Sequence, residues 1–543
     1  MINDFSMDSE VFTARRSVQV PLCDNTPETE VVGDFSLPDY QPEIKRLLRI
    51  GAVPQPPDRM AGGDGMEMSG RLDYFVLYTG HDDRLYCAPL TTEYRLEATM
   101  GDAERALAAS CGEPMIAVCD TVTDTPVGRV TAPRRLNIRC RVKSHVKMYG
   151  EYLTEGSDTE DATVETLMGE TEVARLFLGV SDPLPLEDDI ILSPRDGEWR
   201  VVCAEGQAMV TEATPGAGRV DLRGEVLFKL MLSPAENAEE FASDAAPMVA
   251  PELTVMQRKI PFSHAVPLDG VTPICAATAH AVCTDITVQM GEGQVHVDMS
   301  LISEVRAQKN ENVRYVKDIY STRREGISRY ATLPTELAAR ALCGNFTLSD
   351  SRPLEEVGMD PAARVADVTA VAHPETLTVD TTKGRCVLSG TCHARLLLIR
   401  DGEYSGADLD LPFRYEFDDP ALIRMEEGTD ATLDTTFDGH ITVMNCRARM
   451  DGERVGMDAE LAVSLRTYRP APMVALSEFA PGVEVTRRRG EYVICFPAPT
   501  DSVWSVAKRY HAPMAAFTAA NNLPAGVAAD AVESLEGAGY LIV

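Results

Sequence analysis

Aromatic residues and long apolar runs are scarce in this sequence. Its 543 residues include 2 Trp, 15 Phe and 16 Tyr, so its hydrophobic cores must rest mainly on Val, Leu, Ile, Met and Ala. No run of about 18 apolar residues occurs, which argues against a membrane-spanning helix. The stretch Met1–Glu10 is acidic and has no apolar segment. We therefore expect no secretory signal peptide and a cytoplasmic protein.

The cysteines lack the pattern of a secreted disulfide framework. There are 13, an odd number, and no two form a CxxC motif; the nearest pairs are Cys111/Cys119 and Cys386/Cys392. A chain of this length can bury its own core without covalent staples. We therefore expect reduced cysteines, most of them packed in strands as small apolar side chains.

The common signatures of catalysis are also missing. The sequence contains no GxSxG, HExxH or GxxxxGK[ST] motif, and no GxGxxG after a strand. Its nine His are scattered, with no pair four residues apart, so they suggest no metal site. We expect no enzyme activity, no cofactor and no metal. An enzyme with a site assembled across repeats is an alternative that nothing in the sequence favours.

Acidic residues are in clear excess. The net charge is -33 and the pI is about 4.7. Nucleic acids and anionic membranes are bound by clustered Lys and Arg, so neither is the expected partner. The acidity favours solubility, and a basic protein partner is the alternative.

Short segments recur along the chain, which is too long for a single core. Val32–Pro42 (VGDFSLPDYQP) and Cys343–Pro353 (CGNFTLSDSRP) share Gly, Phe, Leu, Asp and Pro in register, and Leu178–Pro183 is a weaker copy. After each copy a glycine opens an apolar strand. These glycines are Gly70, Gly224 and Gly390.

Each repeat closes with a stretch that has the character of half-buried strands. These stretches are Arg135–Met148, Gln294–Gln308 and Arg454–Tyr468, and the last alternates apolar and polar residues. The pattern predicts a mainly β fold of three tandem antiparallel β-sandwich or barrel-like modules. Their expected ranges are 1–150, 165–325 and 330–475.

Two further features are expected at the borders of these modules. Short helices are predicted at Glu165–Leu178 and Leu333–Leu342, at the entrances of the second and third modules. Gly150–Glu172 and Lys309–Ser328 are predicted to be the joints between modules.

A smaller C-terminal module with the order strand, helix, helix, strand is predicted at residues 489–543. Tyr492–Phe496 is a candidate strand, and Thr500–Ser502 can cap a helix that places Val503, Val506, Ala507 and Tyr510 on its core face. Pro513 opens a second helix that stops at Asn521, and Tyr540–Val543 forms the last strand.

The C-terminal module resembles a LysM domain through Tyr492–Val493, Ser502–Tyr510, Asn521–Leu523 and the last strand. The upstream modules resemble the sporulation repeats called SPOCS domains through Val32–Ile50 and Lys317–Thr322. Together they resemble the SipL-type spore-coat morphogenetic proteins over nearly the whole chain.

That resemblance implies an intracellular scaffold of spore-coat assembly in the mother-cell cytoplasm, at the forespore surface. In this family the LysM-like module engages the coat-basement ATPase, and we expect the β modules to provide self-association or localisation surfaces. The alternative is a LysM protein that binds peptidoglycan or chitin in the cell envelope or spore cortex. Replacement of the usual Gly-Asp-Thr by Pro499-Thr500-Asp501 makes sugar binding less expected.

Two parts of the C-terminal module are candidate partner-binding surfaces. Trp504 lies about 100° from the core stripe of its helix, above Lys508 and His511, which is typical of an interface anchor. Packing of Trp504 at the edge of the module core is an equally good interpretation. The second candidate is a groove between two loops, for which ordinary loop chemistry is the alternative. Its residues are Pro499, Thr500, Asp501, Ser502, Val503, Asn521, Asn522, Leu523 and Pro524.

Overall fold

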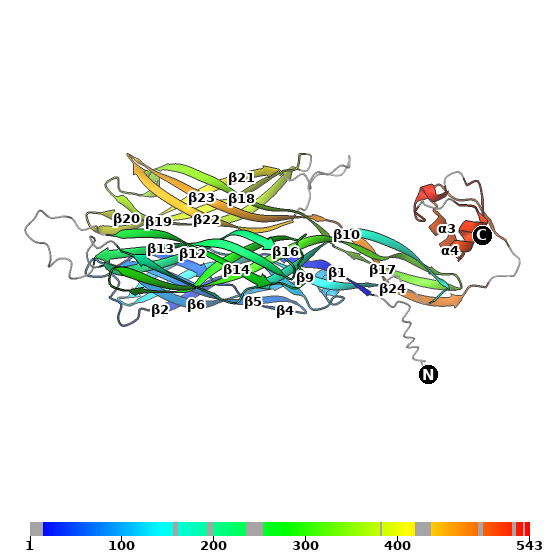
Figure 1. Ribbon diagram of the computed structural model, residues 1–543, viewed down its shortest axis with the longest axis horizontal. Helices are drawn as coiled ribbons and strands as arrows, with labels where there is room; N and C mark the ends of the chain where they lie inside the picture. Colours follow the sequence, from blue (N-terminus) through cyan, green and yellow to red (C-terminus); the bar gives the residue numbers. More distant parts are fainter. Residues whose placement is uncertain are drawn as a thin grey trace, which may run out of the picture.

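A computed structural model describes residues 15–155, 161–192, 199–234, 253–380, 383–418, 436–486, 492–523, 528–535 and 538–543. In these ranges the chain is mainly β, as predicted, and its sheets are antiparallel. The strands run along the long axis of an elongated body, and the C-terminal residues lie at one end (Figure 1). No helix in the described part of the chain is long and apolar enough to cross a membrane.

Most strands fall into three successive groups. The first group contains β1 (Arg15–Asn25), β2 (Glu28–Ser36), β3 (Arg46–Pro54), β4 (Asp58–Gly62), β5 (Gly65–Thr79), β6 (Leu85–Thr99), helix α1 (Asp102–Ala108), β7 (Met115–Thr123), β8 (Val127–Ala132) and β9 (Arg135–Glu155). The second group contains β10 (Val164–Val180), β11 (Leu184–Ile191), β12 (Trp199–Pro215), β13 (Arg219–Pro234), β14 (Thr254–Pro267), β15 (Ala276–Met290) and β16 (Gln294–Ser321). The third group contains β18 (Glu336–Pro353), helix α2 (Leu354–Val357), β19 (Arg364–Asp380), β20 (Arg385–Arg400), β21 (Glu403–Asp418), β22 (Thr436–Asp451) and β23 (Arg454–Pro470).

The same strand order recurs in each group. The last strand of a group (β9, β16 or β23) is the centre of one sheet, and the opening strands of the group pair with one of its edges. The strands just before the last one pair with its other edge: β7 and β8, β15, or β22. Each group also contains a second sheet, whose central strand is β5 in the first group, β13 in the second and β20 in the third. The two sheets of a group contribute to shared hydrophobic cores.

The recurring glycines occupy equivalent places in these second sheets. Gly70, Gly224 and Gly390 are each the sixth residue of the central strand, so the prediction that they open the strand is wrong. Each faces an aromatic residue of the next strand along the chain. The pairs are Gly70/Tyr94, Gly224/Phe262 and Gly390/Phe413. A Cβ on any of the three glycines would lie 2.4–2.6 Å from the facing ring, so the ring occupies the space that a side chain would fill.

The short helices predicted at Glu165–Leu178 and Leu333–Leu342 are wrong. Residues 165–178 lie within β10, which pairs with β16 over its whole length, and β18 begins at Glu336 and pairs with β23. The local pattern suggested helices, but long antiparallel partners satisfy the backbone groups of both segments.

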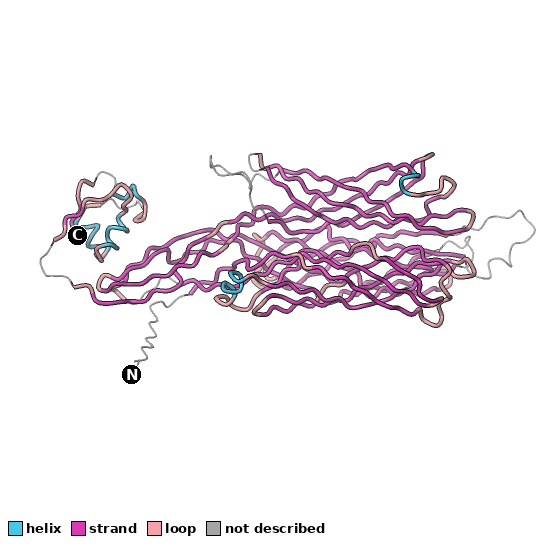
Figure 2. Tube along the Cα trace, turned by 180° about the vertical axis from the view of Figure 1, so that it is seen from behind, coloured by secondary structure: helices cyan, strands magenta, loops and turns pink. Residues whose placement is uncertain are grey.

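The expected joints at Gly150–Glu172 and Lys309–Ser328 are also mainly strand. Residues 309–321 of β16 pair with β10, while β17 (Arg324–Leu333) pairs with β24 (Met473–Glu484). We call β17, β24 and the adjoining parts of β10 (164–175) and β16 (309–321) the arm. Buried Val316, Ile319, Leu476 and Phe479 form its core. The arm projects from the body toward the C-terminal residues (Figure 2).

A buried ion cluster joins the three groups inside the body. Arg49 of β3 contacts Asp367 of β19 (2.9 Å) and Glu205 of β12 (3.2 Å). Lys229 of β13 contacts the other oxygen of Asp367 at 2.8 Å. The Asp367 and Arg49 side chains are only 3% and 6% exposed, so these charges depend on one another for solvation.

The C-terminal residues have the predicted strand, two helices and final strand, with a 3-10 helix added before the last strand, and their core includes Tyr320 of β16. They form β25 (Ile494–Cys495), α3 (Val503–Arg509), α4 (Met514–Ala520), the 3-10 helix η3 (Val532–Leu535) and β26 (Leu541–Ile542). β25 pairs antiparallel with β26. We call the described part of residues 492–543 the C-terminal unit.

Candidate functional site

The core face of α3 is as predicted, because Val503, Val506 and Ala507 are all buried. Ser502 caps the helix: its hydroxyl oxygen accepts a hydrogen bond from the Ser505 amide at 3.2 Å. Such a cap satisfies an amide of the first turn that has no partner within the helix.

Trp504 is buried between the C-terminal unit and the arm. Its side chain is only 5% exposed, and its ring packs edge-on against Tyr320, with 5.0 Å between ring centroids. Its Nε1 donates a 2.7 Å hydrogen bond to Oδ2 of Asp318. Of the two interpretations of Trp504, the structure supports packing at the edge of the module core, because the outward face of the side chain meets β16 and not solvent.

The other two residues proposed beside Trp504 contact the same strand end. Lys508 donates to Oδ1 of Asp318, and Nδ1 of His511 donates to the carbonyl oxygen of Ser321 at 2.8 Å. Trp504, Lys508 and His511 thus lie on one face, as predicted, but the end of β16 in the same chain covers that face.

Asp318 is the electrostatic centre of this contact. It accepts hydrogen bonds from Trp504, Lys508 and the hydroxyl of Tyr330. Burial alone would raise the pKa of Asp318, but the hydrogen bonds from Lys508, Tyr330 and Trp504 outweigh it and lower that pKa. A second ion pair, Lys317–Asp530 at 2.6 Å, lies nearby.

In each of the two loops of the proposed groove, side chains make hydrogen bonds to other residues of the C-terminal unit. Asp501 accepts from the Ala498 amide and pairs with Arg509, and the side-chain amide of Asn521 donates to the carbonyl oxygens of Phe517 and Ile542. Ser502 and Val503 are buried, and Leu523 packs against the core, while Pro499 and Thr500 are exposed. Asn522 has a positive φ of 50°. Pro524 lies outside the described residues.

An apolar surface that the sequence analysis missed covers the outer face of β25 and β26. Cys495 and Leu541 point into the core, so their neighbours in the strands point outward. We call this outward surface the apolar sheet face. Its residues and their exposed fractions are Tyr492 81%, Ile494 62%, Phe496 75%, Tyr540 60% and Ile542 37%. The alternation of Tyr492, Ile494 and Phe496 was the sequence signal for this surface. It did not indicate an exposed face, because the residues between them are also apolar and a strand with two apolar faces is usually buried on both.

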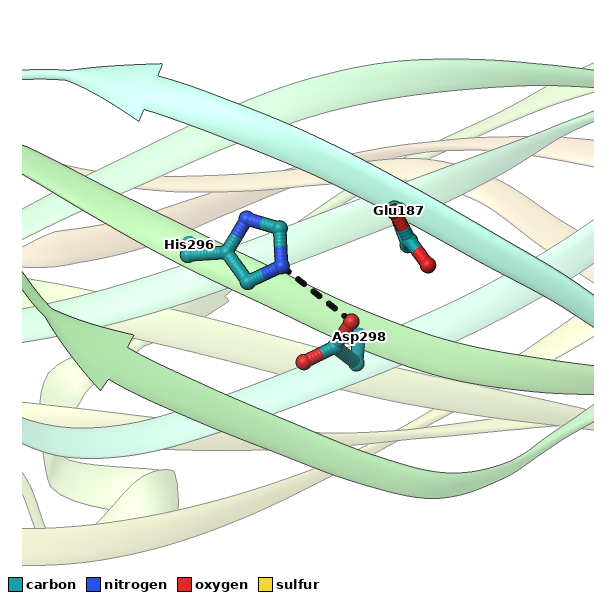
Figure 3. Close-up of side chains that lie close together, drawn as sticks. All are labelled: Glu187, His296 and Asp298. Atoms are coloured by element: carbon teal, nitrogen blue, oxygen red, sulfur yellow. Dashed lines mark ion pairs between the residues drawn. The ribbon is translucent and has the colours of Figure 1, made fainter.

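A cluster of potential metal ligands lies on the surface of the second group, although no metal site was predicted. Glu187 of β11 and His296 and Asp298 of β16 place one ligand atom each within 4.8 Å of one another (Figure 3). Both ring nitrogens of His296 already face carboxylates, Asp189 at 2.8 Å and Asp298 at 3.2 Å. The hydrogen bond to Asp189 raises the pKa of His296. A protonated imidazole would offset only one of the carboxylate charges of Glu187, Asp189 and Asp298.

Comparison with family models, with curated proteins and with solved structures found no match to this chain.

Proposed function

We propose that the chain is a non-enzymatic scaffold of the SipL type, acting in the mother-cell cytoplasm at the forespore surface. In this proposal the three β groups are SPOCS-like sandwich modules, and the C-terminal unit is a LysM-like module that docks the coat-basement ATPase. The recurrence of one strand order in all three groups supports a repeated framework. The order strand, helix, helix, strand supports the comparison with LysM.

The observation that carries the proposal is the apolar sheet face. Five apolar or aromatic side chains, with no charged residue among them, lie outward on a unit whose core is already formed, in part with Tyr320 of the arm. Apolar patches of this kind mark interaction surfaces, since monomeric proteins tend to avoid them. In a chain of net charge -33, an uncharged patch is also where a partner meets least electrostatic repulsion.

In this proposal the two faces of the C-terminal unit have separate roles. The Trp504 face fixes the unit to Asp318 and Tyr320, while the apolar sheet face stays free for the ATPase. Because the arm already holds the C-terminal unit in place, binding of a partner to its apolar sheet face would cost less conformational entropy.

Co-purification with the coat-basement ATPase, expressed in the same cells, tests this assignment. Phe496→Glu should abolish capture because it places a charge in the middle of the apolar sheet face. Val532→Glu is the matched control, because Val532 is 48% exposed on η3 of the same unit, and it should leave capture intact. If the chain lacking residues 489–543 still captures the ATPase, the docking assignment is wrong.

Binding of peptidoglycan or chitin is the second candidate function. The exposed rings of Tyr492, Phe496 and Tyr540 favour it, because flat aromatic faces, two of them here with a polar hydroxyl, suit amphipathic ligands such as sugars. A pull-down on purified cell wall and on chitin separates the two candidates. Retention of the wild-type chain that is lost in Phe496→Ala, together with no capture of the ATPase, would favour the glycan.

A further inference from the structure

The last strands of the three β groups carry a basic residue at the same repeat position. Lys147, Arg306 and Arg466 lie twelve residues after Arg135, Gln294 and Arg454, the first residues of the three closing stretches. Each follows a buried apolar residue: Val146, Val305 or Leu465. The repeat therefore places three cations at equivalent points of β9, β16 and β23.

These three cations converge in the interior, around Asp438 of β22. Nε of Arg466 donates to Oδ1 of Asp438 at 2.9 Å, and Arg306 lies 3.7 Å from the same oxygen. The Lys147 ammonium lies 4.6 Å from the ring centroid of Tyr468, whose hydroxyl donates to Oδ2 of Asp438 at 2.9 Å. Although burial alone would raise the pKa of Asp438, the charges of Arg466, Arg306 and Lys147 lower it strongly.

A small cavity with charged and polar groups in its wall opens at this point, between the equivalent strands β7, β15 and β22. Its volume is about 50 Å³, and its lining includes Arg306, Arg466, Asp120, His280 and His440. We call it the junction cavity. It is larger than the roughly 10–15 Å³ that one water molecule needs, and far too small for a nucleotide or a lipid headgroup.

The junction cavity contains hydrogen-bond donors that lack acceptors. Arg466 is only 2% exposed, and its Nη1 has no hydrogen-bond partner among the described residues. Arg306 has no side-chain hydrogen bond within the same part of the chain, and its one ion pair is the 3.7 Å contact with Asp438. A buried guanidinium nitrogen without a partner is costly, so an acceptor is expected in the cavity.

The imidazoles on the cavity wall are donors as well. The rings of His280 and His440 stand edge to face, with centroids 4.5 Å apart. Burial, together with the charge of Arg306, lowers the pKa of His280 to about 4, and burial and His280 lower the pKa of His440. Both rings are therefore neutral near pH 7, and each keeps one N–H group.

The carboxylates on the wall do not balance the cations. Glu304 pairs with Arg59, and Asp438 alone faces both Arg306 and Arg466. Burial raises the pKa of Asp120 to about 7, so this group supplies only part of a charge near neutral pH. Lys147 has an ion pair outside the cavity, with Asp24 at 3.3 Å. Positive charge is thus in excess at the cavity itself.

We infer that the junction cavity binds a small oxyanion such as inorganic phosphate, held by Arg306, Arg466 and the N–H groups of His280 and His440. Planar guanidinium groups match the oxygen geometry of phosphate. The anion would bridge the second and third β groups, because its ligands come from β15, β16, β22 and β23.

Calorimetric titration of the full chain with phosphate tests this inference, with chloride at equal ionic strength as the blank. Phosphate should bind and raise the melting temperature, because it binds only the folded state. Arg306→Gln should bind about tenfold more weakly or worse, since it loses a charge-assisted hydrogen bond. Arg95→Gln removes an arginine that is 60% exposed on β6, and this control should bind like wild type.

Absence of heat and of a melting shift in the wild-type chain would overturn the inference, and so would equal affinities of Arg306→Gln and wild type. Circular dichroism verifies that each variant is folded. If Arg306→Gln does not fold, His280→Leu removes a donor without leaving a charge unpaired. Unchanged affinity of His280→Leu would contradict the assignment in the same way.

Discussion

Nε1 of Trp504 donates a 2.7 Å hydrogen bond to Asp318 across 186 residues of sequence. This bond links α3 of the C-terminal unit to the end of β16 in the arm. Around it, Lys508, His511 and Tyr320 add polar and aromatic contacts. The orientation of the C-terminal unit, and with it the direction in which the apolar sheet face points, therefore depends on Asp318.

Replacement of Asp318 by Asn should release the C-terminal unit from the arm. The variant removes the charge that attracts Lys508, so the contact should weaken by about 1–3 kcal/mol. We expect faster amide hydrogen exchange at residues 316–321 and a larger radius in X-ray scattering. Asp410→Asn is the matched control, because Asp410 is 72% exposed on β21. Identical exchange in the two variants would show that Asp318 does not hold the unit.

Acid should release the same contact. The folded-state pKa of Asp318 is lowered, so its contribution is fully present above the unfolded value of about 3.9 and is lost as pH falls through the lower folded value. Emission from Trp504, measured in a Trp199→Phe background, should shift to longer wavelength as pH drops below about 4. The shift should be absent from Asp318→Asn, which has no carboxyl to titrate. A transition of equal size in both chains would contradict this origin.

The sequence predicted what depends on repetition and local pattern. The mainly β fold, the closing strands and the core face of α3 all follow from period-two and period-3.6 burial, which is a local property. The helix predicted at Glu165–Leu178 failed because β16, more than a hundred residues away, completes a ladder with it. Trp504 is buried because it contacts Asp318 and Tyr320. A local sequence pattern does not predict contacts of this kind between remote segments.

The junction cavity also could not be predicted from local sequence, because its lining comes from remote segments. A motif search examines neighbouring residues, whereas Arg306, Arg466, His280 and His440 come from four strands in two repeats. The available signal was the recurrence of a basic residue at one repeat position, Lys147, Arg306 and Arg466. It becomes visible only when the closing strands are placed in register, and the structure adds that these positions face one another.

Alanine at the recurring glycines should destabilise the body unequally. At Gly224 and Gly390 a Cβ would lie 2.2 and 2.1 Å from backbone carbonyl oxygens of the neighbouring strand, whereas at Gly70 it meets only the Tyr94 ring. Backbone gives way less easily than a ring, so Gly224→Ala and Gly390→Ala should cost about 1–3 kcal/mol or more, and Gly70→Ala less. Gly63→Ala is the control, with nothing within 4 Å of its Cβ. Urea unfolding gives the order, and equal effects at all four sites would refute it.

Removal of the Asp367 carboxylate should weaken the contact among all three β groups. Asp367 contacts Arg49 through one carboxylate oxygen and Lys229 through the other, and its loss leaves two buried cations with too little counter-charge. Asp367→Ala should therefore cost about 3–5 kcal/mol in urea unfolding. Glu478→Ala breaks the exposed Arg329–Glu478 pair of the arm and should cost about 1 kcal/mol or less.

A second variant separates charge from packing at Asp367. Arg49→Met with Asp367→Leu removes one cation together with the carboxylate, and Glu205 loses its partner Arg49 but is 27% exposed and can be hydrated. If unpaired charge is the cause, this double variant should be more stable than Asp367→Ala, because only Lys229 remains uncompensated. If it is less stable than Asp367→Ala, the single substitution acts through lost packing, and the ion cluster does not hold the groups together.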